Sequence, residues 1–169
     1  HGRRLVFMRR WNPAQALQLI QTEKITQFNG APSMVMQLLA EPGFDDPAIT
    51  GSLGGVGFGG AGLPQRLIDD VLGRRGDSMS GIGFGLTETN GVGAAASGRL
   101  FQLRPHASGL ISPIIELRVA EFDGTPLPTG ESGELWLRGV TVMKEYCAQP
   151  DATARALDGG WFRSGDIGM

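Results

Sequence analysis

Apolar and polar residues follow two rhythms along the first 95 residues. Short apolar runs predict strands, and stretches in which apolar residues recur every three or four positions predict helices. The expected strands are residues 4–8, 25–28, 53–58 and 79–85, and the expected helices run from 12 to about 24, from 33 to 40 and from 64 to 74. Asn12 and Pro13 suit the start of the first helix, as its N-cap and its first residue. This alternation of strands and helices favours parallel strands joined by right-handed crossovers.

The pattern changes after about residue 95. Apolar runs at 110–121, 134–139 and 141–146 predict strands, and turn sequences such as Asp123-Gly124 separate them. Helical periodicity returns at 151–157. We therefore predict an α/β fold with a parallel sheet and crossover helices in residues 1–95, followed by an antiparallel sheet or partial barrel in residues 96–169.

Composition and charge disfavour several kinds of partner. The chain has 169 residues and a formal net charge of −2, and this balance favours neither a nucleic acid nor a lipid surface. No apolar run approaches the length of a membrane span, and we expect no signal peptide. Cys147 is the single cysteine, so no intrachain disulfide can form and a cytoplasmic location is expected.

Glycine is the unusual component, with 27 of 169 residues, well above the average share of roughly 7%. The glycines cluster at 51–62, 81–93 and 159–168 beside polar residues, which predicts shaped loops. Two of these clusters follow expected parallel strands, and ligands bind outside the carboxyl ends of such strands.

The segment GIGFGLTE (81–88) combines bare main chain with groups that suit a nucleotide. The ring of Phe84 offers a face for a planar group such as a purine. Thr87 can donate to a phosphate oxygen, and Glu88 is a hard oxygen ligand for Mg²⁺. A strand–turn–helix corner that starts with Thr-Glu explains this stretch equally well.

The segment DGGWFRSGDIG (158–168) places Asp166 after Ser164-Gly165 in an expected tight turn. A carboxylate held in this way can accept hydrogen bonds from two neighbouring ribose hydroxyls. An isolated aspartate of this kind is more often only a turn residue.

Five segments together resemble the adenylate-forming superfamily of acyl- and aryl-CoA synthetases, luciferases and peptide-synthetase adenylation domains. ITQFNGAPSMVMQLL (25–39) resembles the family's acyl-pocket segment, and GGAGLP (59–64) resembles its adenine loop. GFGLTE (83–88) resembles the aromatic-Gly-x-Thr-Glu motif. GESGELWLRG (130–139) resembles the Gly-Glu-Leu strand, and WFRSGDIG (161–168) resembles the Trp-x-x-Thr-Gly-Asp motif. The chain departs from the family pattern at Gly62, where Pro or Ala is common, at Phe84, where Tyr is usual, and at Ser164, where Thr is usual.

The resemblance implies a role for each motif residue. The implied nucleotide-binding residues are Gly59, Gly60, Ala61, Phe84, Gly85, Thr87 and Asp166. Of these, Asp166 would bind the ribose, Thr87 would bind phosphate, and Glu88 would hold Mg²⁺, so that Thr87 and Glu88 count as catalytic. Phe28, Asn29 and Gly83 would line the acyl pocket.

The implied reaction joins a carboxylic acid to ATP, which gives an acyl-adenylate and pyrophosphate, and then transfers the acyl group to coenzyme A. The apolar pocket segment favours an apolar acyl group, and a long- or medium-chain fatty-acid–CoA ligase is the expected type. A peptide-synthetase-type adenylation domain is the alternative within the enzyme class, although no Asp at the start of the pocket segment offers to bind an amino acid's ammonium group. A non-catalytic nucleotide- or partner-binding module is the alternative from another class.

The resemblance also implies that this chain is the central part of a longer domain. The family's phosphate loop with its lysine would precede it, and a small domain with the catalytic lysine would follow, so we expect no turnover by the isolated chain. We further expect self-association, because the apolar helix faces that partner segments would cover are predicted to be exposed. Those faces carry Leu17, Ile20, Val35, Leu38 and Leu39.

Overall fold

The computed structural model describes residues 2–60, 62–76 and 78–169, and the chain divides into two compact units. Unit 1 comprises the residues up to Ile82 together with Ala96–Ala107, and unit 2 comprises Gly83–Ala95 and Ser108–Met169. Each unit has its own cluster of buried apolar side chains. The assignment of residues 1–95 and 96–169 as subdomains of the whole protein stays a prediction.

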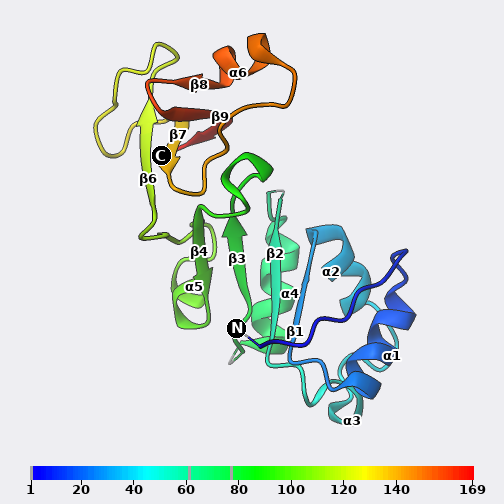
Figure 1. Cartoon of the computed structure of the whole chain (residues 1–169). Coiled ribbons are helices and arrows are strands. Elements are labelled where there is room, and N and C mark those ends of the chain that lie inside the picture. The colour runs from blue at the N-terminus through cyan, green and yellow to red at the C-terminus, as the bar shows by residue number, and fades with distance from the viewer. Residues whose placement is uncertain (1, 61, 77) are drawn as a thin grey trace. The chain divides into compact units, whose positions relative to one another are not determined.

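The first sheet has five strands in the spatial order β1-β2-β3-β4-β5 (Figure 1). They are β1 (Gln27–Gly30), β2 (Gly55–Gly59), β3 (Gly81–Phe84), β4 (Ala94–Ser97) and β5 (Leu110–Ile111). The pair β1 and β2 is parallel, with Phe28 opposite Val56, whereas β4 and β5 are antiparallel, with Ala94 opposite Ile111. The predicted parallel pairing is confirmed for β1 and β2, and antiparallel pairing begins within this same sheet.

The helices of unit 1 surround its part of this sheet (Figure 1). They are α1 (Pro13–Glu23), α2 (Pro32–Leu39), α3 (Pro47–Thr50), α4 (Gln65–Arg75) and α5 (Arg99–Leu103). The side chain of Asn12 accepts a hydrogen bond of 2.8 Å from the main-chain N–H of Gln15, which confirms the predicted cap of α1. In the part of the chain that the structure describes, no helix is long and apolar enough to cross a membrane.

The apolar faces of α1 and α2 are buried inside unit 1. Helix α2 packs against β1 and β2, and α1 packs against α2 and α3. The side chains predicted to be exposed are therefore covered by their own unit, and the most accessible of them, Leu17, is only 6% exposed. The prediction of exposed helix faces is wrong, because Phe44 and Leu53 from the following loops join this cluster. Self-association stays a prediction and loses this argument.

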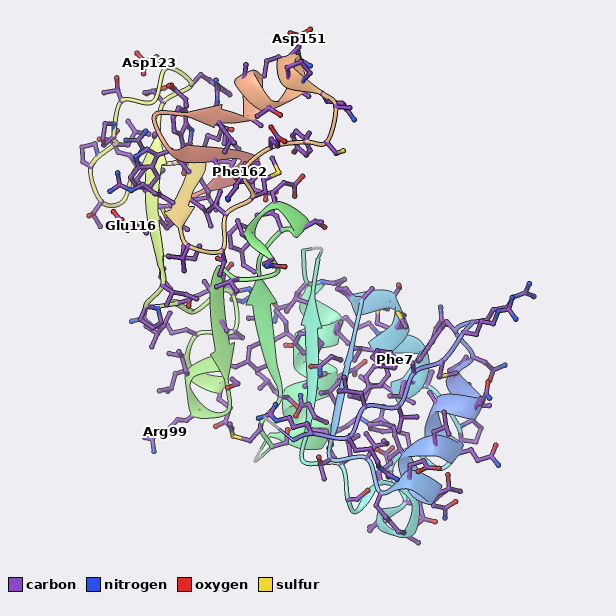
Figure 2. The ribbon with its side chains drawn as sticks, viewed as in Figure 1. Phe7, Arg99, Glu116, Asp123, Asp151 and Phe162 are labelled. Atoms are coloured by element: carbon purple, nitrogen blue, oxygen red, sulfur yellow. The ribbon has the colours of Figure 1, made fainter. Side chains whose placement is uncertain are left out.

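Two predicted strands do not form. Residues 4–8 are assigned to no strand, and Phe7 is 84% exposed (Figure 2). Residues 141–146 form turns and irregular structure instead of a strand. An apolar run alone does not make a strand, because its main-chain N–H and C=O groups also need a neighbouring strand to bond with. The predicted strand at 110–121 is interrupted at Pro113, which has no N–H to donate.

Unit 2 contains a four-stranded antiparallel sheet in the order β6-β7-β9-β8. The strands of this sheet are β6 (Ile115–Ala120), β7 (Gly133–Gly139), β8 (Leu157–Asp158) and β9 (Trp161–Gly168). Unit 2 also contains the 3₁₀ helix η1 (Thr87–Thr89) and the helix α6 (Pro150–Ala156). Leu137 and Phe162 are buried in one apolar cluster, while the neighbouring Trp136 lies on the other face of the sheet and stacks with Arg118 and Arg163. The predicted antiparallel region is confirmed.

Candidate functional site

The segment after β3 folds back closely on itself, and its glycines make this approach possible. A side chain at Gly85 would clash with the main chain of Gly91, and one at Gly93 would clash with the main chain of Phe84. The ring of Phe84 is partly buried and packs against the apolar cluster of unit 2. At least part of the glycine pattern therefore serves the turn itself.

Thr89 holds this turn together. Its side chain is fully buried, and its hydroxyl accepts a hydrogen bond of 3.0 Å from the N–H of Leu86 and donates one of 3.1 Å to the C=O of the same residue. The turn leaves Thr87 exposed and Glu88 half-buried. Sequence reasoning did not single out Thr89, although its place three residues after the start of the turn is typical of a side chain that caps a turn.

Glu88 is bound on two sides by the loop that follows β7. The phenol of Tyr146 donates a hydrogen bond of 2.7 Å to Glu88 Oε1, and the N–H of Met143 donates one of 2.7 Å to the Glu88 C=O. The N–H of Tyr146 in turn donates to Thr153 Oγ1 in α6. The hydrogen bond to Glu88 raises the pKa of Tyr146, and burial and the negative charge of Glu88 raise this pKa further. The carboxylate is thus held in a defined position.

The chain has one tyrosine, so an alkaline absorbance titration reports on Tyr146 alone. We expect Tyr146 to ionise above the ordinary tyrosine pKa of about 10, and we expect Glu88→Gln to lower this pKa. Because the folded pKa is the higher one, the contact stabilises the fold fully below the unfolded pKa, and this stabilisation is lost as pH rises through the folded pKa. The exposed Glu145 of the same loop offers a control, since Glu145→Gln should leave the titration unchanged. A Tyr146 pKa that Glu88→Gln does not lower would contradict the contact.

Asp166 lies in a bulge of β9. Three residues of β9, Ser164, Gly165 and Asp166, lie opposite the single Leu135 of β7. Gly165 has a φ of 74°, and its N–H donates a hydrogen bond of 3.0 Å to Glu134 Oε1. The N–H of Asp166 donates a hydrogen bond of 3.0 Å to Ser164 Oγ, and the Asp166 side chain is exposed. The predicted tight turn is therefore a bulge within a strand, which brings Asp166 to the surface.

The neighbours of Glu88 and Asp166 line one open hollow of about 750 Å³ in unit 2. Among its lining residues are Glu134, Tyr146, Arg155, Arg163, Ser164 and Gly165. Tyr146 is the hydrogen-bond partner of Glu88, and Gly165 directly precedes Asp166. Tyr146, the partner of Glu88, thus borders the same hollow as Ser164 and Gly165, which belong to the motif of Asp166. Sequence reasoning treated Tyr146 and Glu134 as strand residues and assigned a role to neither.

The expected adenine loop belongs to unit 1. Gly59 ends β2, and Gly60 has a φ of 78°, a conformation that favours glycine. Ala61 lies outside the described residues. Phe84 and Gly85 belong to unit 2, so the adenine clamp between these residues and the loop stays a prediction.

Two of the expected acyl-pocket residues, Phe28 and Asn29, line an open hollow of about 1170 Å³ in unit 1. Trp11 and Met34 line the same hollow, and the rings of Trp11 and Phe28 lie 5.7 Å apart, centroid to centroid. Gly83, the third expected pocket residue, belongs to unit 2 and is exposed.

Glu88 suits a metal ion that is shared with a substrate. No group of three or more His, Cys, Asp or Glu side chains that could hold a metal occurs among the residues placed in the structure. Mg²⁺ does not need such a group, because it commonly uses one or two carboxylates together with water and substrate phosphates. A half-buried carboxylate beside the exposed Thr87 hydroxyl fits that mode of binding.

Comparison with known proteins connects these features to a family. Residues 1–147 match the family of AMP-binding enzymes. The chain is 32% identical over 168 residues to 4-coumarate–CoA ligase-like 6 of Arabidopsis thaliana and 34% identical over 164 residues to the feruloyl-CoA synthase of an Amycolatopsis species. These alignments cover 98% and 93% of this chain but 30% and 31% of the two relatives. The chain therefore spans about a third of the length of the curated relatives it matches.

A solved structure has the same fold. The amide bond synthetase of Marinactinospora thermotolerans matches with a TM-score of 0.84 and 28% sequence identity. The match covers 96% of this chain and 33% of that protein. Both units of the chain therefore follow one known architecture, which agrees with the mixed parallel and antiparallel fold predicted from the sequence.

Proposed function

The chain belongs to the family of AMP-binding enzymes, and we propose that it is part of an ATP-dependent ligase that activates a carboxylic acid as its acyl-adenylate and passes the acyl group to coenzyme A. One observation carries the proposal: the partners of two motif carboxylates, Glu88 and Asp166, border the same hollow. A nucleotide needs acceptors for its ribose hydroxyls and a counter-charge for its phosphates, and these two carboxylates suit the two tasks.

Asp166 and Thr87 act on the nucleotide in this proposal. The exposed Asp166 carboxylate accepts hydrogen bonds from the ribose hydroxyls, and the bulge keeps its main chain in one place. The exposed Thr87 hydroxyl donates to a phosphate oxygen.

Glu88 would hold Mg²⁺ together with the phosphates of ATP. When bound, the ion would offset the negative charge that the acid's carboxylate meets as it approaches the α-phosphate. The phenol of Tyr146 keeps one oxygen of Glu88 oriented through its hydrogen bond. Pyrophosphate leaves from the α-phosphorus as the acid oxygen bonds to it. The thiol of coenzyme A then displaces AMP and forms the thioester.

An aromatic acid is the first candidate substrate. The two relatives are a 4-coumarate–CoA ligase-like protein and a feruloyl-CoA synthase, and the paired rings of Trp11 and Phe28 beside Asn29 offer flat apolar contacts. A long- or medium-chain fatty acid, as the sequence alone predicts, is the second candidate, because Met34 and other flexible apolar residues line the same hollow.

ATP–pyrophosphate exchange in the full-length enzyme that carries this chain tests the proposal. We expect exchange with 4-coumarate or ferulate to exceed exchange with octanoate or palmitate by about tenfold or more, the discrimination that a few apolar contacts provide. Added coenzyme A should yield the aryl thioester. Exchange driven by amino acids would favour a peptide-synthetase-type domain, and AMP binding without any exchange would favour a non-catalytic module. Thioester formation from fatty acids alone would support the second candidate.

A further inference from the structure

We infer that the buried carboxylate of Glu134 is a positioning residue that fixes the Ser164–Gly165–Asp166 bulge and thereby aims Asp166. The contact between Glu134 and the bulge does not depend on the proposed function. The inference rests on that function only for the ribose that Asp166 binds. Glu134 belongs to β7 and contacts the bulge from the neighbouring strand.

Donors approach Glu134 from two strands. The residue is 6% exposed, and its Oε1 accepts the hydrogen bond of 3.0 Å from Gly165 N–H. Its Oε2 accepts a hydrogen bond of 3.0 Å from the indole N–H of Trp136 and lies 3.4 Å from the Arg163 guanidinium. A buried carboxylate is tolerated when it is paired and hydrogen-bonded in this way.

The bulge needs such an acceptor. Where β9 carries two extra residues, the regular ladder of main-chain hydrogen bonds between β9 and β7 is interrupted. The N–H groups of Gly165 and Asp166 then end on side chains, one on Glu134 and the other on Ser164. Gly165 is exposed, so without Glu134 its N–H would bond to water, and this contact between the bulge and β7 would be lost. Glu134 thus accepts a main-chain hydrogen bond that a C=O group of the paired strand accepts in a regular sheet.

The environment of Glu134 keeps its carboxylate from turning away. The indole of Trp136 is 1% exposed, and the guanidinium groups of Arg118 and Arg163 lie 4.7 and 5.1 Å from its ring centroid. Gly124, with a φ of 88°, packs so closely on the same indole that a side chain there would clash with it. The Trp136 donor is therefore fixed, and it fixes Oε2 while Oε1 faces the bulge.

Amide hydrogen exchange in the full-length enzyme that carries this chain tests the positioning directly. Glu134→Leu removes both acceptor oxygens, and we expect exchange at the Gly165 N–H to become about fivefold faster, the change that corresponds to one lost hydrogen bond. Glu134→Gln keeps one acceptor oxygen and should give a smaller increase. If the leucine variant does not fold, the glutamine variant still decides the inference, and unchanged Gly165 exchange and unchanged Asp166 amide shifts would overturn it.

The matched control is Glu116→Gln. Glu116 is an exposed carboxylate on β6 that pairs with Arg138 at 2.5 Å, so it shares the sheet and an arginine partner but not the contact with the bulge (Figure 2). We expect exchange at Gly165 to be unchanged in this variant. Faster Gly165 exchange in Glu116→Gln as well would mean that any lost charge loosens the sheet, which would also overturn the inference.

Nucleotide binding separates positioning from general loosening. In Glu134→Gln we expect the affinity for AMP to fall severalfold and the affinity for 2′,3′-dideoxy-AMP to stay unchanged, because only the ribose contact depends on the aim of Asp166. Equal losses for both nucleotides would overturn the positioning role. Equal affinity of the unchanged protein for both nucleotides would instead refute the ribose role of Asp166, and Gly165 exchange would still decide the role of Glu134.

Discussion

Replacement of Glu88 by alanine is expected to lower the rate of acyl-adenylate formation by about a hundredfold or more, the loss that follows removal of one major electrostatic contact in a transition state. The variant removes the carboxylate that we propose for Mg²⁺. ATP–pyrophosphate exchange in the full-length enzyme, measured across a range of Mg²⁺ concentrations, checks the prediction.

Two variants of the same loop serve as controls for this result. Tyr146→Phe keeps the charge of Glu88 and removes only its hydrogen-bond donor, so its effect on exchange should be much smaller than that of Glu88→Ala. Glu145→Gln removes an exposed charge from the same loop and should have no effect. Near-normal exchange in Glu88→Ala would refute the metal role. A loss in Tyr146→Phe as large as that in Glu88→Ala would mean that the phenol itself takes part in the reaction.

Local features of the sequence could be predicted because their causes lie within a few residues. The cap at Asn12 and the turn framed by Gly85 and Gly93 each depend on contacts across at most nine positions. Ser164 and Gly165 predicted an irregular main chain just before Asp166. The structure shows this irregularity as a bulge within a strand, which the sequence did not predict. The motifs themselves were identified by their resemblance to the family, and the family match over residues 1–147 includes all of them except WFRSGDIG (161–168).

Long-range contacts could not be predicted from these patterns. Tyr146 lies 58 positions after Glu88, and the apolar run around it predicted a strand that does not form. Its role depends on a loop that bonds through Met143 N–H to the Glu88 main chain, and no local pattern signals that bond. A polar residue at Glu134, directly before a run of apolar strand residues, was the one available hint of a buried carboxylate.

The predicted exposure of the apolar faces of α1 and α2 was also wrong, because the residues that cover them lie outside these helices. The periodicity of α1 and α2 marks an apolar face but does not identify what covers it. In the structure Phe44 and Leu53, which lie outside those helices, help to close the cluster. The opposite error occurs at residues 4–8, where apolar Leu5 is 69% exposed because no strand pairs with this run.

Replacement of Asp166 by asparagine is expected to weaken AMP binding by about 1.5–3 kcal/mol, roughly 10- to 150-fold, the range for hydrogen bonds to charged groups. Asparagine keeps the size and one acceptor oxygen but removes the charge that strengthens the bonds to the ribose hydroxyls. Calorimetry of AMP binding to the full-length enzyme is the measurement. Asp158→Asn is the matched control, because Asp158 is an exposed carboxylate that lines the same hollow and lies outside the motif.

The nucleotide that lacks a ribose hydroxyl decides whether the loss arises at the ribose. If Asp166 binds the 2′-hydroxyl, Asp166→Asn should cost less affinity for 2′-deoxy-AMP than for AMP, and equal losses would place the ribose elsewhere.

A double variant tests in the same way whether Glu134 acts through Asp166. A residue that acts only by aiming Asp166 has nothing left to aim once that carboxylate is gone. Glu134→Gln added to Asp166→Asn should therefore cost little further AMP affinity, whereas two independent contributions would add.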